Sequence, residues 1–199
     1  MTRTPAAQRV LPWALPLVIA ASAVACGGSD STSTSSGSVS GDVFGTSFPS
    51  VAEVEAVRYG ALACTSSDMP SSILDLTLDS TTGNCVALGD GRTLPSDTRL
   101  RFIITLAANT DVSATTYLLD GGKGQAELTR SDPTCGTPVD YKATGGTLTL
   151  SSVTDSGVAG SFRVTFSDGS STATLVGSFT SGTCAPSTEK YCSTSRNCG

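Results

Sequence analysis

The sequence predicts an all-β fold, either an antiparallel β-sandwich or a flattened barrel, stapled by disulfides. Three observations support this prediction. Short segments alternate apolar and polar residues, Gly and Asp-Gly pairs separate these segments, and seven cysteines occur in 199 residues. The composition agrees, because only 15% of the residues are charged and 21 are glycine.

The clearest predicted strand covers residues 98–107, where the even-numbered positions from 100 are apolar and Arg99 and Arg101 lie on the opposite face. A strand at 73–79 likewise places leucines on one face and Asp75 and Asp79 on the other, and a turn at 81–84 follows it. A one-residue slip would bury the two arginines, so the register of this region is expected to be firm.

The C-terminal half shows the same alternation. One long strand is predicted at 139–153, bent at Gly145-Gly146, and residues 147–180 are predicted to form a three-strand antiparallel meander. Residues 51–63 are ambiguous, because Ser50 and Glu53 match a helix capping box whereas positions 57, 59 and 61 alternate as in a strand. We favour the strand, since the segments that follow it are β.

Residues 1–25 have the pattern of a secretory signal peptide. Arg3 and Arg9 form a positive beginning, and an apolar stretch from Leu11 follows. Pro12 and Pro16 interrupt this stretch, which is also too short for a good membrane-spanning helix. The chain is therefore expected to be exported.

Two cleavage sites compete at the end of the leader. Residues 23–25 form an A-x-A site for ordinary secretion, and together with Cys26 they resemble the lipobox of bacterial lipoproteins, with Ala23 where Leu is most common. Cysteine parity favours lipid on Cys26, because six cysteines then remain for three disulfides in an oxidising compartment. The remaining six are Cys64, Cys85, Cys135, Cys184, Cys192 and Cys198. Their pairing is open, with Cys192–Cys198 as the first hypothesis.

The predicted organisation has three parts. They are the signal peptide (1–25), the lipidated cysteine with a Ser/Gly/Thr-rich flexible tether (26–41), and a β-domain with a cysteine-rich tail (42–199). The net charge of −5 becomes −7 without the two leader arginines. This acidity argues against a nucleic-acid partner.

Catalytic and metal motifs are scarce in the sequence. There is no histidine, which excludes Ser-His-Asp triads and HExxH zinc sites, and there is no C-x-x-C pair. Ser187 and Lys190 match S-x-x-K, but they lie in the cysteine-rich tail of a small β protein. Residues 121–124 lack the spacing of a phosphate loop and are predicted to form a hairpin turn.

Carboxylate pairs are the remaining enzyme candidates, because two acids can hydrolyse a glycosidic bond. The candidates are Glu53, Glu55, Asp75, Asp79 and Glu127. Asp75 and Asp79 alternate with leucines, so we interpret their strand face as solvated and not as catalytic. No catalytic residue, metal or cofactor is predicted.

Two further binding hypotheses stay open. The Asp-Gly pairs at 90–91, 120–121 and 168–169 could donate oxygens to calcium, although ordinary turns explain them better. A carbohydrate-binding module would need exposed aromatic residues, and the only tryptophan, Trp13, lies in the leader. The available tyrosines are Tyr59, Tyr117, Tyr141 and Tyr191.

The segments G-T-L-T-L at 146–150, G-S-F at 160–162, F-S-D-G at 166–169 and G-S-F-x-x-x-x-C at 177–184 carry a resemblance. They resemble the C-terminal β-meander of uncharacterised lipoproteins of Gram-negative bacteria. The resemblance covers about 40 residues with a structural motif, and it implies a fold and an envelope address without an activity.

Taken together, the sequence predicts a lipid-anchored envelope protein with a binding or structural role, not an enzyme. The membrane is the expected partner through the lipid, at the outer membrane with a periplasmic or surface face, and an envelope protein or glycan is the expected further partner. The alternatives are a secreted protein, a carboxylate-dependent glycan hydrolase, and a calcium-dependent adhesion or carbohydrate-binding module.

Overall fold

The computed structural model describes residues 35–65, 68–193 and 196–198. The expected signal peptide and Cys26 lie outside these residues. Strands account for 56% of the described residues and helices for 8%, so the fold is all-β as predicted. No helix in the described ranges has the length and apolar composition needed to cross a membrane.

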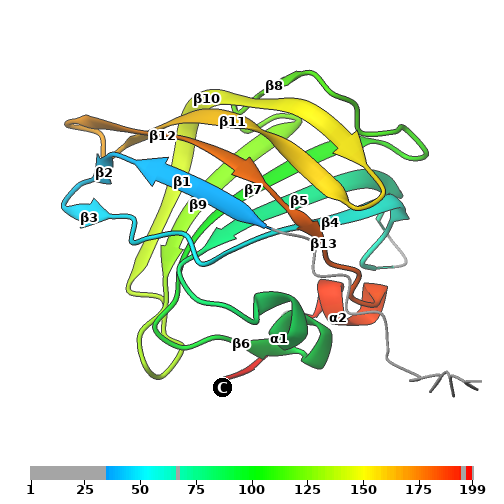
Figure 1. Ribbon diagram of the computed structural model, residues 1–199, viewed down its shortest axis with the longest axis horizontal. Coiled ribbons are helices and arrows are strands. Elements are labelled where there is room, and N and C mark those ends of the chain that lie inside the picture. The colour runs from blue at the N-terminus through cyan, green and yellow to red at the C-terminus, as the bar shows by residue number, and fades with distance from the viewer. Residues whose placement is uncertain (1–34, 66–67, 194–195, 199) are drawn as a thin grey trace, which may run out of the picture. The chain divides into compact units, whose positions relative to one another are not determined.

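Ten strands form one curled sheet (Figure 1). They are β1 (Ser36–Ser40), β4 (Glu53–Leu62), β5 (Ser71–Asp79), β7 (Thr98–Ala107), β8 (Thr116–Leu118), β9 (Gly124–Arg130), β10 (Val139–Thr154), β11 (Gly157–Ser167), β12 (Thr172–Thr180) and β13 (Gly182–Thr183). The order is β1-β12-β11-β10-β9-β7-β5-β4-β13, with β8 also beside β10. Neighbours pair antiparallel except β13, which runs parallel to β4. The predicted meander is thus β10-β11-β12, and the ambiguous segment is strand β4.

The long strand β10 joins the two halves of the sheet. Its first residues pair with β9, and residues beyond Gly146 pair with β8, while β11 follows it on the other side. Gly146 has a φ of +133°, and a Cβ there would lie 2.2 Å from the carbonyl oxygen of Arg163. Only glycine accommodates both conditions, so the predicted bend at Gly145-Gly146 is confirmed, with a register shift after Ala143.

The core lies between the two halves of the curled sheet. The leucines of β5 and the apolar residues of β7 point into it from one half, and Leu148, Val164 and Phe166 point into it from the other. The rings of Phe102 and Phe162 meet across this core with centroids 5.0 Å apart. Alternation therefore turns one face of each of these strands into the core, as the period of two predicts.

Strand β1 corrects the predicted start of the domain. Residues 36–40 fall within the segment expected to be a flexible tether, yet they pair with β12 along their whole length. Val39 packs against the core, and Gly37 lies close enough to Val54 and Leu78 for a Cβ to contact both. Small residues provide little packing area, but backbone hydrogen bonds to an existing edge strand do not depend on side-chain size.

Within the described residues, two short helices and four short strands complete the fold, and Figure 1 shows α1 and α2 beside the sheet. They are β2 (Asp42–Val43), β3 (Thr46–Ser47), α1 (Asn84–Asp90), β6 (Arg92–Thr93), α2 (Thr188–Cys192) and β14 (Asn197–Cys198). Helix α1 follows the residues predicted to be only a turn. The S-x-x-K motif is a helix cap, because the Ser187 hydroxyl accepts a hydrogen bond from the Lys190 N–H.

Three disulfides join the C-terminal tail to the body. The pairs are Cys64–Cys192, Cys85–Cys184 and Cys135–Cys198, with Cα separations of 5.2, 5.6 and 5.6 Å. The hypothesis of a local Cys192–Cys198 loop is therefore wrong. The parallel pairing of β14 with β6 carries Cys198 away from α2, so each tail cysteine meets a different part of the body.

Candidate functional site

The outer face of β4, β5 and β7 is covered, and this corrects the interpretation of Asp75 and Asp79 as a solvated face. Asp75 is 5% exposed and Asp79 is 0% exposed. The residues following β5, including α1, and the disulfide-bonded tail supply partners to this face. Alternation of leucine and aspartate predicts two different faces but does not reveal whether another segment covers the polar one.

Asp75 is neutralised by an arginine from the neighbouring strand. The Arg101 guanidinium donates from Nε to both carboxylate oxygens at 3.0 and 3.1 Å and from Nη2 to Oδ2 at 2.7 Å. Tyr191 of α2 donates its hydroxyl to the same Oδ2 at 2.9 Å. A carboxylate occupied in this way anchors the tail to the sheet and is unsuited to act as a nucleophile or base.

Asp79 lies in a second ion pair. Arg99 donates from Nε to its Oδ1 at 2.6 Å and also contacts Asn84 and Asp97. Burial, together with the charge of Asp97, raises the pKa of Asp79 to about 7 against the opposing effect of Arg99. Its Oδ2 has no hydrogen-bond partner among the described residues.

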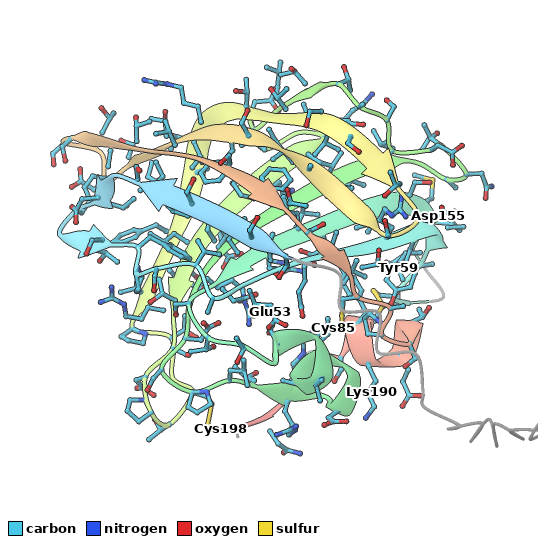
Figure 2. The ribbon with its side chains drawn as sticks, in the orientation of Figure 1. Glu53, Tyr59, Cys85, Asp155, Lys190 and Cys198 are labelled. Atoms are coloured by element: carbon cyan, nitrogen blue, oxygen red, sulfur yellow. A yellow bond between two sulfur atoms is a disulfide. The ribbon has the colours of Figure 1, made fainter. Side chains whose placement is uncertain are left out.

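Glu53 and Glu55 cap helix α1. The N-cap residue of α1 is Gly83, which has no side chain to accept a hydrogen bond. The N–H groups of Asn84 and Cys85 instead donate to Glu53 and Glu55, each at 2.8 Å. Figure 2 shows Glu53 and Cys85 where the sheet meets α1. The two acids therefore satisfy backbone donors that would otherwise lack partners.

Glu55 is 6% exposed, and its environment favours the protonated form. Burial, followed by the charge and hydrogen bonding of Glu53, raises the pKa of Glu55 to about 8. A buried carboxyl beside a second carboxyl favours its protonated form, because like charges so close together repel. Here the Glu53 and Glu55 carboxyl groups accept hydrogen bonds from the first N–H groups of α1, and this capping role explains why the two acids lie close together.

The metal-binding hypotheses find no suitable ligand set in the described residues. The one group of three potential ligands within 4.8 Å comprises Glu55, Cys85 and Cys184, and the two cysteines form a disulfide. The three Asp-Gly candidates lie in local structures. Asp90 pairs with Arg92, Asp120 accepts from the Gly122 N–H, and Asp168 accepts from two serine N–H groups in its turn. In residues 121–124 the Gly121 N–H donates to the Gly124 carbonyl, but this turn is not the predicted hairpin, because in the described sheet β8 pairs with β10 and not with β9.

The four tyrosines are used within the fold. Tyr59 donates to the Pro186 carbonyl and packs against Tyr191, with ring centroids 5.2 Å apart. Tyr117 donates to the Ser113 carbonyl, and Tyr141 packs edge-on against a phenylalanine. These contacts indicate that the tyrosines pack within the fold and do not favour a flat, exposed platform for binding a sugar.

A polar groove follows β9 on the outer face of the sheet. In register across β7, β9 and β10, Arg101 lies opposite Glu127 and Glu127 lies opposite Lys142. The next row holds Arg99, Thr129 and Asp140. Two cavities, of about 320 and 230 Å³, lie over these rows, and Glu127 lines both. We call this pair of cavities the β9 groove.

The two cavities of the β9 groove differ in lining. The larger one contains Arg101, Gln125 and Lys142, and the smaller one contains Asp140, Thr129 and Ser131 among its polar groups. The larger cavity has two cations and one carboxylate, Glu127, among its lining residues. In the smaller cavity three carboxylates, Asp97, Glu127 and Asp140, outnumber one cation, Arg99, which is paired with Asp79 and Asp97. Such convergent polar groups in a concave surface are typical of ligand sites.

Glu127 lies where the two cavities meet, and its surroundings disfavour its ionised form. Burial and the neighbouring Asp140, by charge repulsion and a side-chain hydrogen bond, raise its pKa, while Arg101 and Lys142 act in the opposite direction. Glu127 is the one of the five carboxylate candidates that lines the β9 groove. Asp140 was not among them, because its position beside Glu127 depends on the pairing of β9 with β10 and not on a local pattern.

No protein-family model, curated protein or solved structure matches the chain.

Proposed function

We propose that the protein is a lipid-anchored component of the bacterial cell envelope, attached through Cys26, and that its β-domain is a binding module with the β9 groove as its binding surface. The leader pattern and the lipobox-like residues 23–26 support the address. Three disulfides use six of the seven cysteines, and Cys26 is the seventh. This parity supports a separate role for Cys26.

The observation that carries the binding role is the meeting of two differently charged cavities at Glu127. Residues from three paired strands line the cavities, and strands position side chains more rigidly than loops do. The Cys135–Cys198 disulfide further ties the C-terminal tail to the loop between β9 and β10.

Carboxylate-dependent glycan hydrolysis is the weaker alternative. Asp75 and Asp79 are paired with arginines, and Glu55 caps a helix. Glu127 lines one cavity with Asp140 of the neighbouring strand. A glycosidase needs its two carboxyl groups on either side of the scissile bond, whereas two acids on one face of a sheet approach a ligand from the same side.

The anchor is tested by replacing Cys26. Cys26→Ser should move the protein from the membrane fraction to the soluble fraction, and mass spectrometry of the native protein should find acyl chains on an N-terminal cysteine. Ser29→Ala, in the same segment, is the matched control and should leave the protein in the membrane fraction. An unmodified N-terminal cysteine, or membrane retention of Cys26→Ser, would contradict the anchor.

The binding role is tested by nuclear magnetic resonance on the full isotope-labelled protein. The probe is the low-molecular-weight fraction of a cell-envelope extract. Amide shifts should concentrate in β7, β9 and β10 and should weaken in Glu127→Gln. Unchanged spectra, or shifts that avoid these strands, would exclude the β9 groove as the binding surface.

A further inference from the structure

The cationic end of the β9 groove has capacity for an anionic group. Arg101 uses Nε and Nη2 for Asp75, but 35% of its side chain remains exposed and it lines the larger cavity. Lys142 lines the same cavity and forms no ion pair with any residue that the structure describes. The guanidinium, the ammonium and the Gln125 amide around this cavity form a set of donors suited to a carboxylate, and they outnumber the one carboxylate that also lines it, Glu127.

The other end has capacity for a cationic group. Glu127 and Asp140 lie on neighbouring strands and line the smaller cavity, whose cation, Arg99, is paired with Asp79 and Asp97. Burial and charge repulsion from Asp140 raise the pKa of Glu127. A cation placed between them would relieve this repulsion. Thr129, which lies opposite Asp140 in register and lines the smaller cavity, adds a hydroxyl acceptor.

We propose that the β9 groove binds a small zwitterion, a free amino acid or short peptide, with its ammonium group between Glu127 and Asp140 and its carboxylate on Lys142 and Arg101. This inference rests on the proposed function, because it takes the β9 groove to be the binding surface. It adds the chemical class of the ligand.

The geometry fits a short peptide. Neighbouring strands are about 4.8 Å apart, so the row from Arg101 through Glu127 to Lys142 spans about 10 Å. Successive Cα atoms of a peptide are about 3.8 Å apart, so the charged ends of a dipeptide can reach from the acidic pair to either cation. The larger cavity, about 320 Å³, lies within the range of small-molecule sites.

An ammonium group fits the acidic end better than calcium does. Calcium takes 6–8 oxygen ligands, whereas an ammonium group has three N–H donors. In the described part of the chain, Glu127 and Asp140 belong to no group of three acidic or thiol ligands within 4.8 Å. The carboxylates of Glu127 and Asp140 and the hydroxyl of Thr129 offer one acceptor group for each of the three N–H donors of an ammonium group.

The experiment is calorimetric titration of the purified full-length protein with three matched probes. Glycylglycine carries both charges, N-acetylglycylglycine only the carboxylate, and glycylglycine amide only the ammonium. Glycylglycine should bind on the order of tenfold more tightly than either singly charged probe, because each lost charge removes a charge-assisted hydrogen-bonding group.

Two variants locate the binding site. Glu127→Gln should weaken glycylglycine binding about tenfold and reduce the advantage of glycylglycine over the N-acetyl probe, since it keeps the shape of the side chain and removes its charge. Lys142→Met should reduce the advantage over the amide probe. Glu189→Gln and Lys190→Met, on α2, are the matched controls and should bind as the unaltered protein does.

The outcomes separate the two proposals. Equal affinity for the three probes, no heat with glycylglycine at millimolar concentration, or unchanged binding by Glu127→Gln would overturn the zwitterion. If the envelope fraction still shifts β7, β9 and β10 while glycylglycine does not bind, the ligand class fails and the binding module stands. If neither binds, both proposals fail.

Discussion

Arg101 on β7 binds both oxygens of Asp75 on β5, and this ion pair lies where the C-terminal tail meets the sheet. Tyr191 of the tail donates to the same carboxylate. One aspartate thus joins a strand pair to a segment more than a hundred residues further along the chain.

Replacing Asp75 should be costly. Asp75→Ala leaves the Arg101 guanidinium and the Tyr191 hydroxyl without their acceptor, and we expect it to lower the free energy of unfolding by about 3 kcal/mol, near the low end for a broken buried pair because Arg101 is partly exposed. Asp90→Ala breaks the exposed pair with Arg92 and should cost less than about 1 kcal/mol. Urea unfolding measures both, and equal losses would contradict the prediction.

Stability should decrease as the pH rises. Glu55 has a folded-state pKa of about 8 against an ordinary value of 4.5, so the folded state binds its proton more tightly than the unfolded state. The resulting stability is fully present below pH 4.5 and is lost as the pH rises through about 8. Asp79, raised to about 7, acts in the same direction.

The test for this linkage is urea unfolding at a series of pH values from 4.5 to 9. Glu55→Gln should flatten the dependence and be more stable than the unaltered protein at pH 9, because an amide cannot ionise beside Glu53. Glu189→Gln, at an exposed position, should keep the original slope. An equal slope in Glu55→Gln would show that this acid does not hold a proton in the folded state.

The Cys85–Cys184 disulfide should fasten β13 to the sheet. Replacing both cysteines by alanine should lower the free energy of unfolding by roughly 2–4 kcal/mol and speed hydrogen exchange of the residue 184 amide, which donates to the Ala56 carbonyl. The double alanine variant of Cys135 and Cys198 should leave exchange at residue 184 unchanged. Comparable protection at residue 184 in both variants would mean that hydrogen bonding alone retains β13.

Gly177 should be required for the docking of β1. A Cβ at this position would lie 2.0 Å from the Ser38 carbonyl oxygen and 2.5 Å from the Phe162 ring. Gly177→Ala should therefore cost about 1–3 kcal/mol and increase hydrogen exchange across residues 36–40. Gly60→Ala is the control, because a Cβ there meets nothing within 4 Å. Unchanged exchange in β1 would refute the steric argument.

Alternating patterns predicted most of the sheet because they report local geometry. Apolar residues at every second position of β5 and β7 define a buried face whatever the neighbouring strand is. Helix α1 left no such pattern, since it is short, contains Gly89, and follows a glycine N-cap. It is capped from outside, by Glu53 and Glu55 of β4, so its existence depends on tertiary contacts.

The candidate site was predicted only in part for the same reason. Glu127 was recognised as one acid among five, but nothing local distinguished it from Asp75 or Asp79. The distinction is the environment: arginines form ion pairs with the two aspartates, whereas Glu127 forms no ion pair among the described residues and lines two cavities. Partners on neighbouring strands are set by the register between strands, which single-strand patterns do not encode.

By itself, the sequence determined that the protein is all-β, where the long β10 strand bends, and that the strands after residue 146 form a meander, because side-chain alternation and glycine conformation act over a few residues. Only the tertiary structure decided which cysteines pair, that β1 belongs to the sheet, that Asp75 and Asp79 are buried, and that Glu127 and Asp140 line one cavity. These features join segments far apart in the chain, and their energies depend on burial and on partners that exist only once the sheet has curled and the tail has covered it.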